Sequence, residues 1–289
     1  MSRTPLSFYC SYYVDTKVDP GAVTNYGGIS PYLDLMLLVD LPKLVSARLP
    51  KKGMRAWQHA EHVAALLALN LTGGDCVDDL VKLDGDPGIG LYMGQIARAV
   101  GAQDRRFSRG GDRDIPSLTS VREWLDQFHN ASEDAKRGYG RAFVPEANEA
   151  LSGLQGVNRE FVSRGFALYQ RSGRPLVSRA TLEVDASFMQ TQKSDALACY
   201  KHFDAYSGLT VRWAVVVLAY NLHATLEKLA MPKGLIGSRF KRLRFHLINV
   251  PARLVSHARR CCVRYFQAAT LHLVQFIRGE LAALRTAFG

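Results

Sequence analysis

The chain has 289 residues, of which 47% are apolar and 22% charged, and its formal net charge is +11. This length supports one large domain or two small ones, and the composition excludes fibrous, collagen-like and low-complexity proteins. The five cysteines are scattered and form no C-x-x-C pair, which argues against a disulfide framework and a zinc knuckle. Without a signal-peptide pattern, and with a longest apolar run of residues 213–220 that is too short for a membrane span, we expect a cytoplasmic protein and no membrane partner.

The positive charge is concentrated near the C-terminal end. Residues 231–289 contain eleven Lys or Arg and one Asp or Glu, whereas residues 1–150 carry a small net negative charge. Clustered cations of this kind most often bind nucleic acid, because they release the counterions condensed on phosphates. A solvated basic tail and an anionic lipid surface are the alternatives.

The first third of the chain is predicted to be helical. A loop over residues 27–31 precedes a helix over 32–39, and a second helix over 57–71 is stopped by Gly73 and Gly74. Asp75 opens a third helix, and residues 103–114 are expected to form an exposed polar loop. We therefore expect helices to dominate residues 1–150.

Residues 115–129 predict an amphipathic helix with two interpretations. The segment SLTSVREWLDQFH carries apolar residues at helical spacing, which is typical of an ordinary core helix. Its N-terminal end carries the residue types that contact phosphates and base edges, which favours a DNA-recognition helix instead: Ser117, Thr119, Ser120 and Arg122.

The middle of the chain changes period. A helix over residues 144–163 is followed by alternating polar and apolar residues at 180–186, which predict a strand. A second strand is expected over 196–203, and a third at Leu209. Two or three strands between helical regions predict an α+β fold that is mostly helical.

Two basic clusters follow. After Pro251, four residues recur at i, i+4, i+7 and i+11, which predicts one face of a helix: Arg253, His257, Arg260 and Arg264. Just upstream lies a second cluster interleaved with apolar residues: Arg239, Lys241, Arg242 and Arg244. We expect both clusters to contact DNA phosphates.

The motifs of common hydrolases, nucleotide-binding folds and zinc proteases are missing, and one carboxylate stands out. Asp185 lies late in a strand with apolar neighbours, where an acid is costly unless it is paired, hydrogen-bonded or bound to a metal. A turn or capping role is the alternative for such a residue.

The stretch ATLEVDASFMQTQKSDALACYKHFDAYSGL, residues 180–209, resembles the first two strands of the RNase H-like core in DDE-type insertion-sequence transposases, in the group 1 DDE domain. The segments GGISPYLDLM, LALNLTGGDCVDDLVKLDGDPGIGLYMG and PSLTSVREWLDQF resemble that family's N-terminal helical DNA-binding region. The segments LAYNLHATLEKLAMP and KRLRFHLINVPARLVSHARR resemble its C-terminal helical region. The resemblance implies that Asp185 is the first catalytic aspartate and a ligand of Mg²⁺.

The chain departs from this family where the rest of the catalytic sheet should follow. Family members carry the second Asp and the final Glu between the first strands and the Ala-Tyr-Asn-Leu helix, and here those regions are almost contiguous. The acids after Asp185 are Asp195, Asp204, Glu227 and Glu280, and none has a matching context. Two-ion cleavage of a phosphodiester needs about three carboxylates, so the resemblance implies a transposase with an internal deletion and an incomplete magnesium site.

These observations divide the chain into three predicted parts: an N-terminal helical DNA-binding region (1–150), a truncated RNase H-like core (151–212) and a basic C-terminal helical region (213–289). The resemblance implies a bacterial, nucleoid-associated transposase that binds double-stranded transposon ends and is deficient in cleavage. A non-enzymatic DNA-binding regulator or inhibitor of transposition is the alternative. An active enzyme whose site is completed by a second copy, or by a full-length transposase, also remains open.

Overall fold

The structure is a computed structural model, and it describes residues 10–14, 22–51, 56–102, 113–136, 146–174, 197–198, 204–205, 209–257 and 260–286. Its α-helices are α1 (Ser30–Leu38), α2 (Leu41–Arg48), α3 (His59–Thr72), α4 (Pro87–Ala99), α5 (Leu118–Asp126), α6 (Glu149–Arg171), α7 (Leu209–Ala230), α8 (Phe240–Leu243) and α9 (Ala268–Thr286). Short 3₁₀ turns are η1 (Gly27–Ile29), η2 (Val77–Lys82) and η4 (Ala131–Lys136), and η5 (Arg244–Ile248) is a π-helix. The strands are β1 (Cys10–Val14), β2 (Ala22–Thr24), β3 (Leu197–Ala198), β4 (Asp204–Ala205), β5 (Ala252–His257) and β6 (Arg260–Tyr265).

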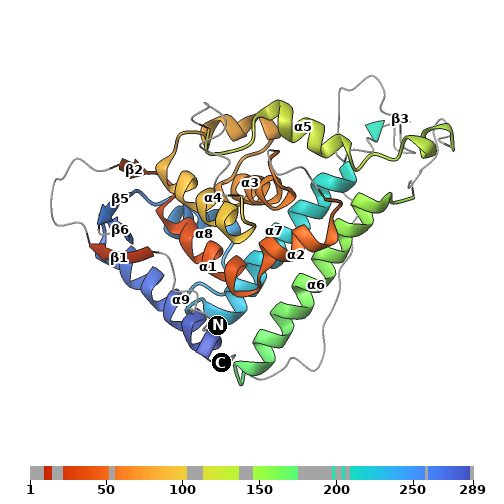
Figure 1. Ribbon diagram of the computed structural model, residues 1–289. Helices are drawn as coiled ribbons and strands as arrows, with labels where there is room; N and C mark the ends of the chain where they lie inside the picture. Colours follow the sequence, from red (N-terminus) through yellow and green to blue (C-terminus); the bar gives the residue numbers. More distant parts are fainter. Residues whose placement is uncertain are drawn as a thin grey trace.

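Helix α3 lies at the centre of the helical body (Figure 1) and packs against α2, α4 and α7. Twelve of its fourteen residues are buried, because its sequence is apolar on nearly every side. It ends where Gly73 adopts a φ of 101°, and the amides of Gly73 and Gly74 both donate to the Leu69 carbonyl oxygen. Helix α3 therefore organises a core that runs continuously from Ile29 to Leu284.

Helices α6 and α7 lie side by side and run in the same direction. The Asn158 side chain donates to the Ala214 carbonyl oxygen at 3.0 Å, and Gly165 faces Thr225. Further along, Arg174 donates to the Lys228 carbonyl oxygen. Because these contacts advance along both helices together, α6 and α7 are parallel.

A four-stranded sheet lies at one edge of the body, with strand order β1-β6-β5-β2. Strands β5 and β6 form a hairpin, β2 pairs antiparallel with β5, and β1 pairs parallel with β6. Its inner face is buried through Thr24, Ala252, Val263 and Tyr265. The sheet is therefore built from the two ends of the chain, which the sequence places more than two hundred residues apart.

Two glycines allow this sheet to meet the π-helix. The Gly27 amide donates to the Val250 carbonyl oxygen at 2.9 Å, and the Tyr265 hydroxyl donates to the Gly27 carbonyl oxygen at 2.7 Å. A Cβ on Gly28 would lie 1.5 Å from the Leu247 carbonyl oxygen. Backbone therefore packs directly on backbone here, which only glycine permits.

The predicted α+β fold that is mostly helical is confirmed, and so are the helices expected over 32–39, 57–71 and 115–129. The helix expected over 144–163 begins instead at Glu149 and ends at Arg171, because the Asn148 side chain caps it by accepting the Leu151 amide. Asp75 opens only the 3₁₀ turn η2. Of the loop expected over 103–114, residues 103–112 lie outside the described residues.

Two predictions were wrong. Residues 253–264 form the β5–β6 hairpin and not a helix, because strands β1 and β2 supply pairing partners that no local pattern reveals. Leu209 begins α7 and not a strand. Of the strand expected over 196–203, Leu197 and Ala198 are described, and they form β3, which pairs with β4. The strand expected at 180–186, which contains Asp185, lies outside the described residues.

No helix among the described residues is both long and apolar enough to cross a membrane.

A buried polar contact joins α1 to α7. The Tyr32 hydroxyl lies 3.0 Å from His223 Nδ1, and both rings are buried. Burial lowers the pKa of His223, while the nearby Glu227 carboxylate opposes this shift. Burial likewise raises the pKa of Tyr32, to which Glu227 adds and which Arg244 opposes. His223 therefore stays neutral in the folded protein at neutral pH.

We expect Gly28→Ala to destabilise the protein by about 3 kcal/mol or more, because the new methyl group would collide with backbone that cannot rotate away. Urea unfolding followed by circular dichroism measures the change. Gly279→Ala in α9 is the control: nothing lies within 4 Å of its Cβ position, and alanine should stabilise the helix interior by roughly 0.5–1 kcal/mol. Equal stability of the two variants would contradict the close contact.

We expect the free energy of unfolding to fall as the pH is lowered through 6.5. The pKa of His223 is lower in the folded protein than in the unfolded chain, so the unfolded chain binds a proton in this range that the folded protein does not bind. His223→Gln keeps an acceptor for the Tyr32 hydroxyl and should reduce this pH dependence. Urea unfolding between pH 8 and pH 5 measures both proteins. The same exchange at the exposed His272 should leave the pH dependence near that of the wild type, and a His223→Gln curve parallel to the wild type would refute the assignment.

Candidate nucleic-acid interface

The basic cluster predicted upstream of Pro251 forms an exposed basic segment, residues 239–246, on α8 and the start of η5. Leu243, Leu247 and Ile248 are fully buried and fix this short helical stretch to the body. The opposite side presents Arg239, Lys241 and Arg242, all exposed. Phe245 and His246 are also exposed, and their rings meet edge to face at 5.3 Å. The stretch therefore displays cations and an aromatic side chain together.

Arg244 differs from its neighbours in the basic segment. Its guanidinium lies 4.7 Å from the centre of the Phe240 ring and donates to the Asn70 carbonyl oxygen at 3.4 Å. Asn70 belongs to the last turn of α3, where free carbonyl groups attract a cation. Arg244 therefore holds the basic segment against α3, and the other three cations of the cluster face outward.

The outward cations of the basic segment lack acidic partners. In the part of the chain that the structure describes, no carboxylate pairs with Arg239, Lys241 or Arg242. Several cations elsewhere on the surface are paired: Lys43 with Asp40, Lys82 with Asp79, Arg113 with Asp84 and Lys136 with Glu133. The local positive field of the basic segment is therefore not cancelled by neighbours.

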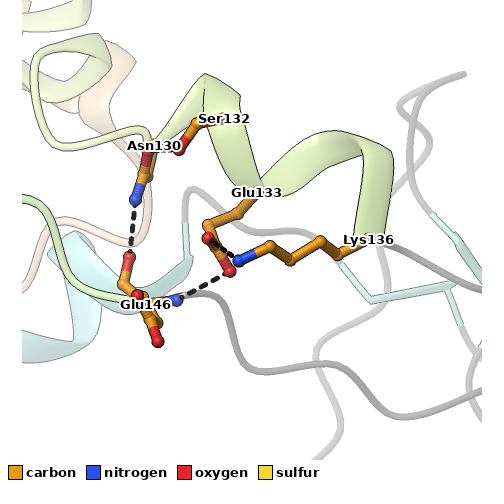
Figure 2. A network of polar contacts seen from close by, with 5 residues as sticks. All are labelled: Asn130, Ser132, Glu133, Lys136 and Glu146. Carbon is orange, nitrogen blue, oxygen red and sulfur yellow. Dashed lines mark hydrogen bonds and ion pairs between the residues drawn. The ribbon is translucent and has the colours of Figure 1, made fainter.

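Figure 2 shows one of the paired cations. Lys136 Nζ lies 2.6 Å from Glu133 Oε1, and the other oxygen of Glu133 accepts the Glu146 amide at 3.3 Å. The Asn130 side chain donates to the Glu146 carbonyl oxygen, which joins the same network. The bond from Lys136 lowers the pKa of Glu133, and the reciprocal bond raises the pKa of Lys136. Such a lysine is occupied within the protein.

The basic cluster predicted after Pro251 lies on the β5–β6 hairpin. Arg253 lies opposite Arg264, and His257 opposite Arg260, so the strand register places all four on the same face although they do not share a helix. Tyr13 of β1 and Val23 of β2 extend the row at the level of Arg253 and Arg264. This face is opposite to the one that buries Ala252 and Tyr265. We name it the hairpin row.

An aromatic side chain accompanies the hairpin row. The Arg253 guanidinium lies 5.8 Å from the centre of the Phe266 ring, which is 45% exposed. A guanidinium over an aromatic face keeps its charge available while its orientation is restricted. Two facing arginines would repel, and Phe266 fixes where one of them lies.

Helix α5 is anchored by its tryptophan. Trp124 is fully buried, donates from Nε1 to His59 Nδ1 at 2.8 Å and stacks on His62 with ring centres 5.2 Å apart. His59 Nε2 is 2.8 Å from the Pro50 carbonyl oxygen, so its two ring nitrogens have complementary partners. These contacts are those of a core helix.

The residues predicted to contact DNA on α5 have partners inside the protein, apart from Thr119. Ser117 caps the helix by accepting the Ser120 amide, and Ser120 lies 3.2 Å from His62 Nε2. Arg122 pairs with Asp78 at 2.6 Å on the surface. Thr119 is exposed, and so are the acids Glu123 and Asp126. A DNA-contacting role for α5 stays a prediction, and the geometry accounts for this helix without one.

The carboxylates do not converge on a metal site among the described residues. No group of three or more His, Cys, Asp or Glu side chains in these residues could hold an ion. Asp185 and Asp195 lie outside the described residues, and Asp204 is placed only by its pairing with Ala198. Glu227 accepts the Gly237 amide, and Glu280 pairs with Arg174 at 2.9 Å. These residues do not fit a Mg²⁺ site, and we derive no step through one.

No family model matches this chain, and neither the curated proteins nor the solved structures contain a match.

Three residues that the sequence patterns did not single out belong to the same surface: His246, Phe266 and Thr270. His246 lies on the π-helix, which no sequence pattern predicts, although such turns often occur at functional sites. Phe266 follows the strand that was mistaken for a helix. Thr270 lies in the mostly apolar first turns of α9, and no sequence signal distinguishes it. Only the fold shows that it lies beside the basic segment.

Proposed function

We propose that this chain binds duplex DNA mainly through phosphate contacts made by the basic segment and the hairpin row. We further propose that it is a cleavage-deficient relative of DDE-type insertion-sequence transposases. The observation that carries the first proposal is the cluster of three exposed cations at 239–242 that have no acidic partner among the described residues, whereas Lys43, Lys82 and Lys136 are each paired with an acid.

Charge placement supports a polyanionic partner. Arg239, Lys241 and Arg242 are exposed on one short stretch, and the only acid after residue 230, Glu280, is engaged by Arg174. A surface of this kind attracts a phosphate backbone and gains affinity from counterion release. The exposed aromatic side chains Phe245 and Phe266 add stacking or apolar contact.

The relation to transposases is supported by the sequence blocks and by where the departure falls. The stretch that resembles the first catalytic strands, residues 180–209, lies in the connection between α6 and α7. Residues 175–208 connect these two helices in the sequence, and a larger catalytic domain could be inserted in that connection without altering α6 or α7. A deletion there would remove carboxylates and spare the basic surface.

A DNA-binding chain that cannot cut acts as a regulator or inhibitor by occupying transposon ends. The carboxylate count favours this second function, because Glu227 and Glu280 are committed to other contacts. A second copy or a full-length transposase would be its partner on the DNA. Nucleoid association would follow from DNA binding.

We expect the triple variant Arg239→Gln, Lys241→Gln, Arg242→Gln to bind every duplex more weakly and to flatten the slope of log K against log salt by about 2.7, at about 0.9 per lost contact. Fluorescence anisotropy between 50 and 300 mM salt, roughly the range in which slopes are resolved, measures it. Arg253→Gln with Arg264→Gln should flatten the slope by about 1.8, and Arg260→Gln should add about 0.9.

The matched control removes three paired cations with the same change in net charge: Lys43→Gln, Lys82→Gln and Lys136→Gln. It should change the slope by less than about 0.5, because contacts and not net charge set the slope. Equal slopes for the two triple variants would refute the interface. Vesicles of anionic phospholipid provide the other test, because tighter binding to them than to DNA would favour a membrane surface.

We expect the purified chain not to nick duplex DNA taken from the flanks of its own reading frame, in either Mg²⁺ or Mn²⁺. A two-ion site needs about three converging carboxylates, and the chain after Asp185 supplies four acids of which two are engaged elsewhere. Agarose electrophoresis of a supercoiled plasmid carrying these flanks measures nicking. Nicking that disappears in Asp185→Ala would show that the site is completed, and would overturn cleavage deficiency.

A further inference from the structure

A pocket of about 430 Å³ lies between the basic segment and the first turn of α9. Arg242, His246 and Asn249 line it from α8 and η5, while Gln267 and Thr270 line it from α9. No Asp or Glu is among the described residues that line it. The rest of the lining is apolar, so the pocket combines an apolar wall with a few polar groups and the cation of Arg242.

The start of α9 adds donors to this pocket. The first helical bond is from the Leu271 amide to the Gln267 carbonyl oxygen at 3.2 Å, so the amides of Ala268, Ala269 and Thr270 precede the ladder. No side-chain cap is formed for them within the described part of the chain. The helix has nineteen residues, and its dipole favours an anion at this end.

The side chain of Thr270 supplies an independent indication of a ligand. It is 6% exposed and faces the pocket, and its hydroxyl has no hydrogen-bond partner among the residues that the structure describes. A hydroxyl that faces a pocket forms its hydrogen bond there, with water or with a bound ligand. An oxygen-rich ligand in the pocket would accept this hydrogen bond.

The chemistry of the lining selects the ligand. Arg242 offers a guanidinium fork, His246 a ring nitrogen, and α9 offers amides together with the Thr270 hydroxyl. All of these groups can donate, and a tetrahedral oxyanion can accept from several directions at once. The side-chain amide of Asn249 donates to the Thr72 carbonyl oxygen. Its side-chain oxygen can only accept hydrogen bonds, and it would weakly repel an oxyanion in the pocket.

We infer that this pocket holds one phosphate group of the bound DNA backbone and so sets where the duplex lies on the protein. The inference rests on the proposed DNA binding and names the phosphate that it fixes. Pro251 lines the pocket directly before β5, and Gln267 directly follows Phe266, whose ring lies below Arg253. A backbone held in the pocket would therefore continue along the hairpin row.

The first test is a titration of the full chain with inorganic phosphate, in which heteronuclear NMR measures the chemical-shift changes of the backbone amides. We expect saturable shifts at Ala269 and Thr270. Arg242→Gln should weaken phosphate binding at least about tenfold and Thr270→Val about three- to tenfold, as expected for charge-assisted and neutral hydrogen bonds. Arg239→Gln removes an equal charge three residues from Arg242 without lining the pocket, and should weaken it less than about twofold.

Thermal unfolding of each variant shows whether a loss of binding is local or comes from a loss of the fold. Thr270→Ser provides a second check, because serine keeps the hydroxyl that valine lacks and should keep phosphate binding. Absence of saturable shifts, or equal weakening in Arg239→Gln and Arg242→Gln, would overturn the pocket. Duplex DNA forms the second arm: Thr270→Val should weaken it about threefold. Phosphate binding without any DNA binding would refute the proposed function and the DNA source of the phosphate, while DNA binding unaffected by Thr270→Val would refute only the pocket's part in it.

Discussion

The contact between Gly27–Gly28 and the backbone of η5 is the constraint on which the rest of the structure depends. Because glycine has no side chain, the backbone of η1 can contact the Leu247 carbonyl group. The Gly27 amide donates a hydrogen bond to the Val250 carbonyl oxygen, and the Gly27 carbonyl oxygen accepts one from the Tyr265 hydroxyl. This one junction joins the start of α1, the end of the π-helix and the sheet. The basic segment leads directly into the π-helix, so the same close contact determines its position on the surface.

Charge is divided between the two halves of the molecule in a way that composition alone conceals. Several cations of the N-terminal half pair with acids of that half, and an exposed pair such as Lys43 and Asp40 contributes little to stability. After residue 230 only Glu280 is left to neutralise eleven Lys and Arg, and Arg174 occupies it. Buried Asp34 takes Arg278 at 3.9 Å, and the end of α3 takes Arg244. The cations that remain without acids are concentrated on α8, which is why we place the polyanion there.

Local sequence patterns predicted the helices well, because their apolar spacing and their stop signals are both local. Helix α3 is a clear case, with a continuous apolar run that ends at Gly73. The hairpin was mistaken for a helix because Arg253, His257, Arg260 and Arg264 satisfy two geometries: one helical face, and one face of two strands joined by a two-residue turn. Only the partners decide between them, and β1 lies some 250 residues away in the sequence. The pocket was not predictable for the same reason, since Thr270 and Arg242 meet only through the fold.

The proposed DNA-binding surface and the stretch that resembles a catalytic core come from different parts of this chain. The pocket, the basic segment and the hairpin row are built from residues before 30 and after 230, and they pack on a continuous core that includes α6 and α7. On the proposed function, a deletion in the connection between α6 and α7 would remove metal ligands and leave the basic segment and the hairpin row in place. Such a chain would keep its affinity for phosphates without the carboxylates for cutting, and it would compete with an intact transposase for the same ends.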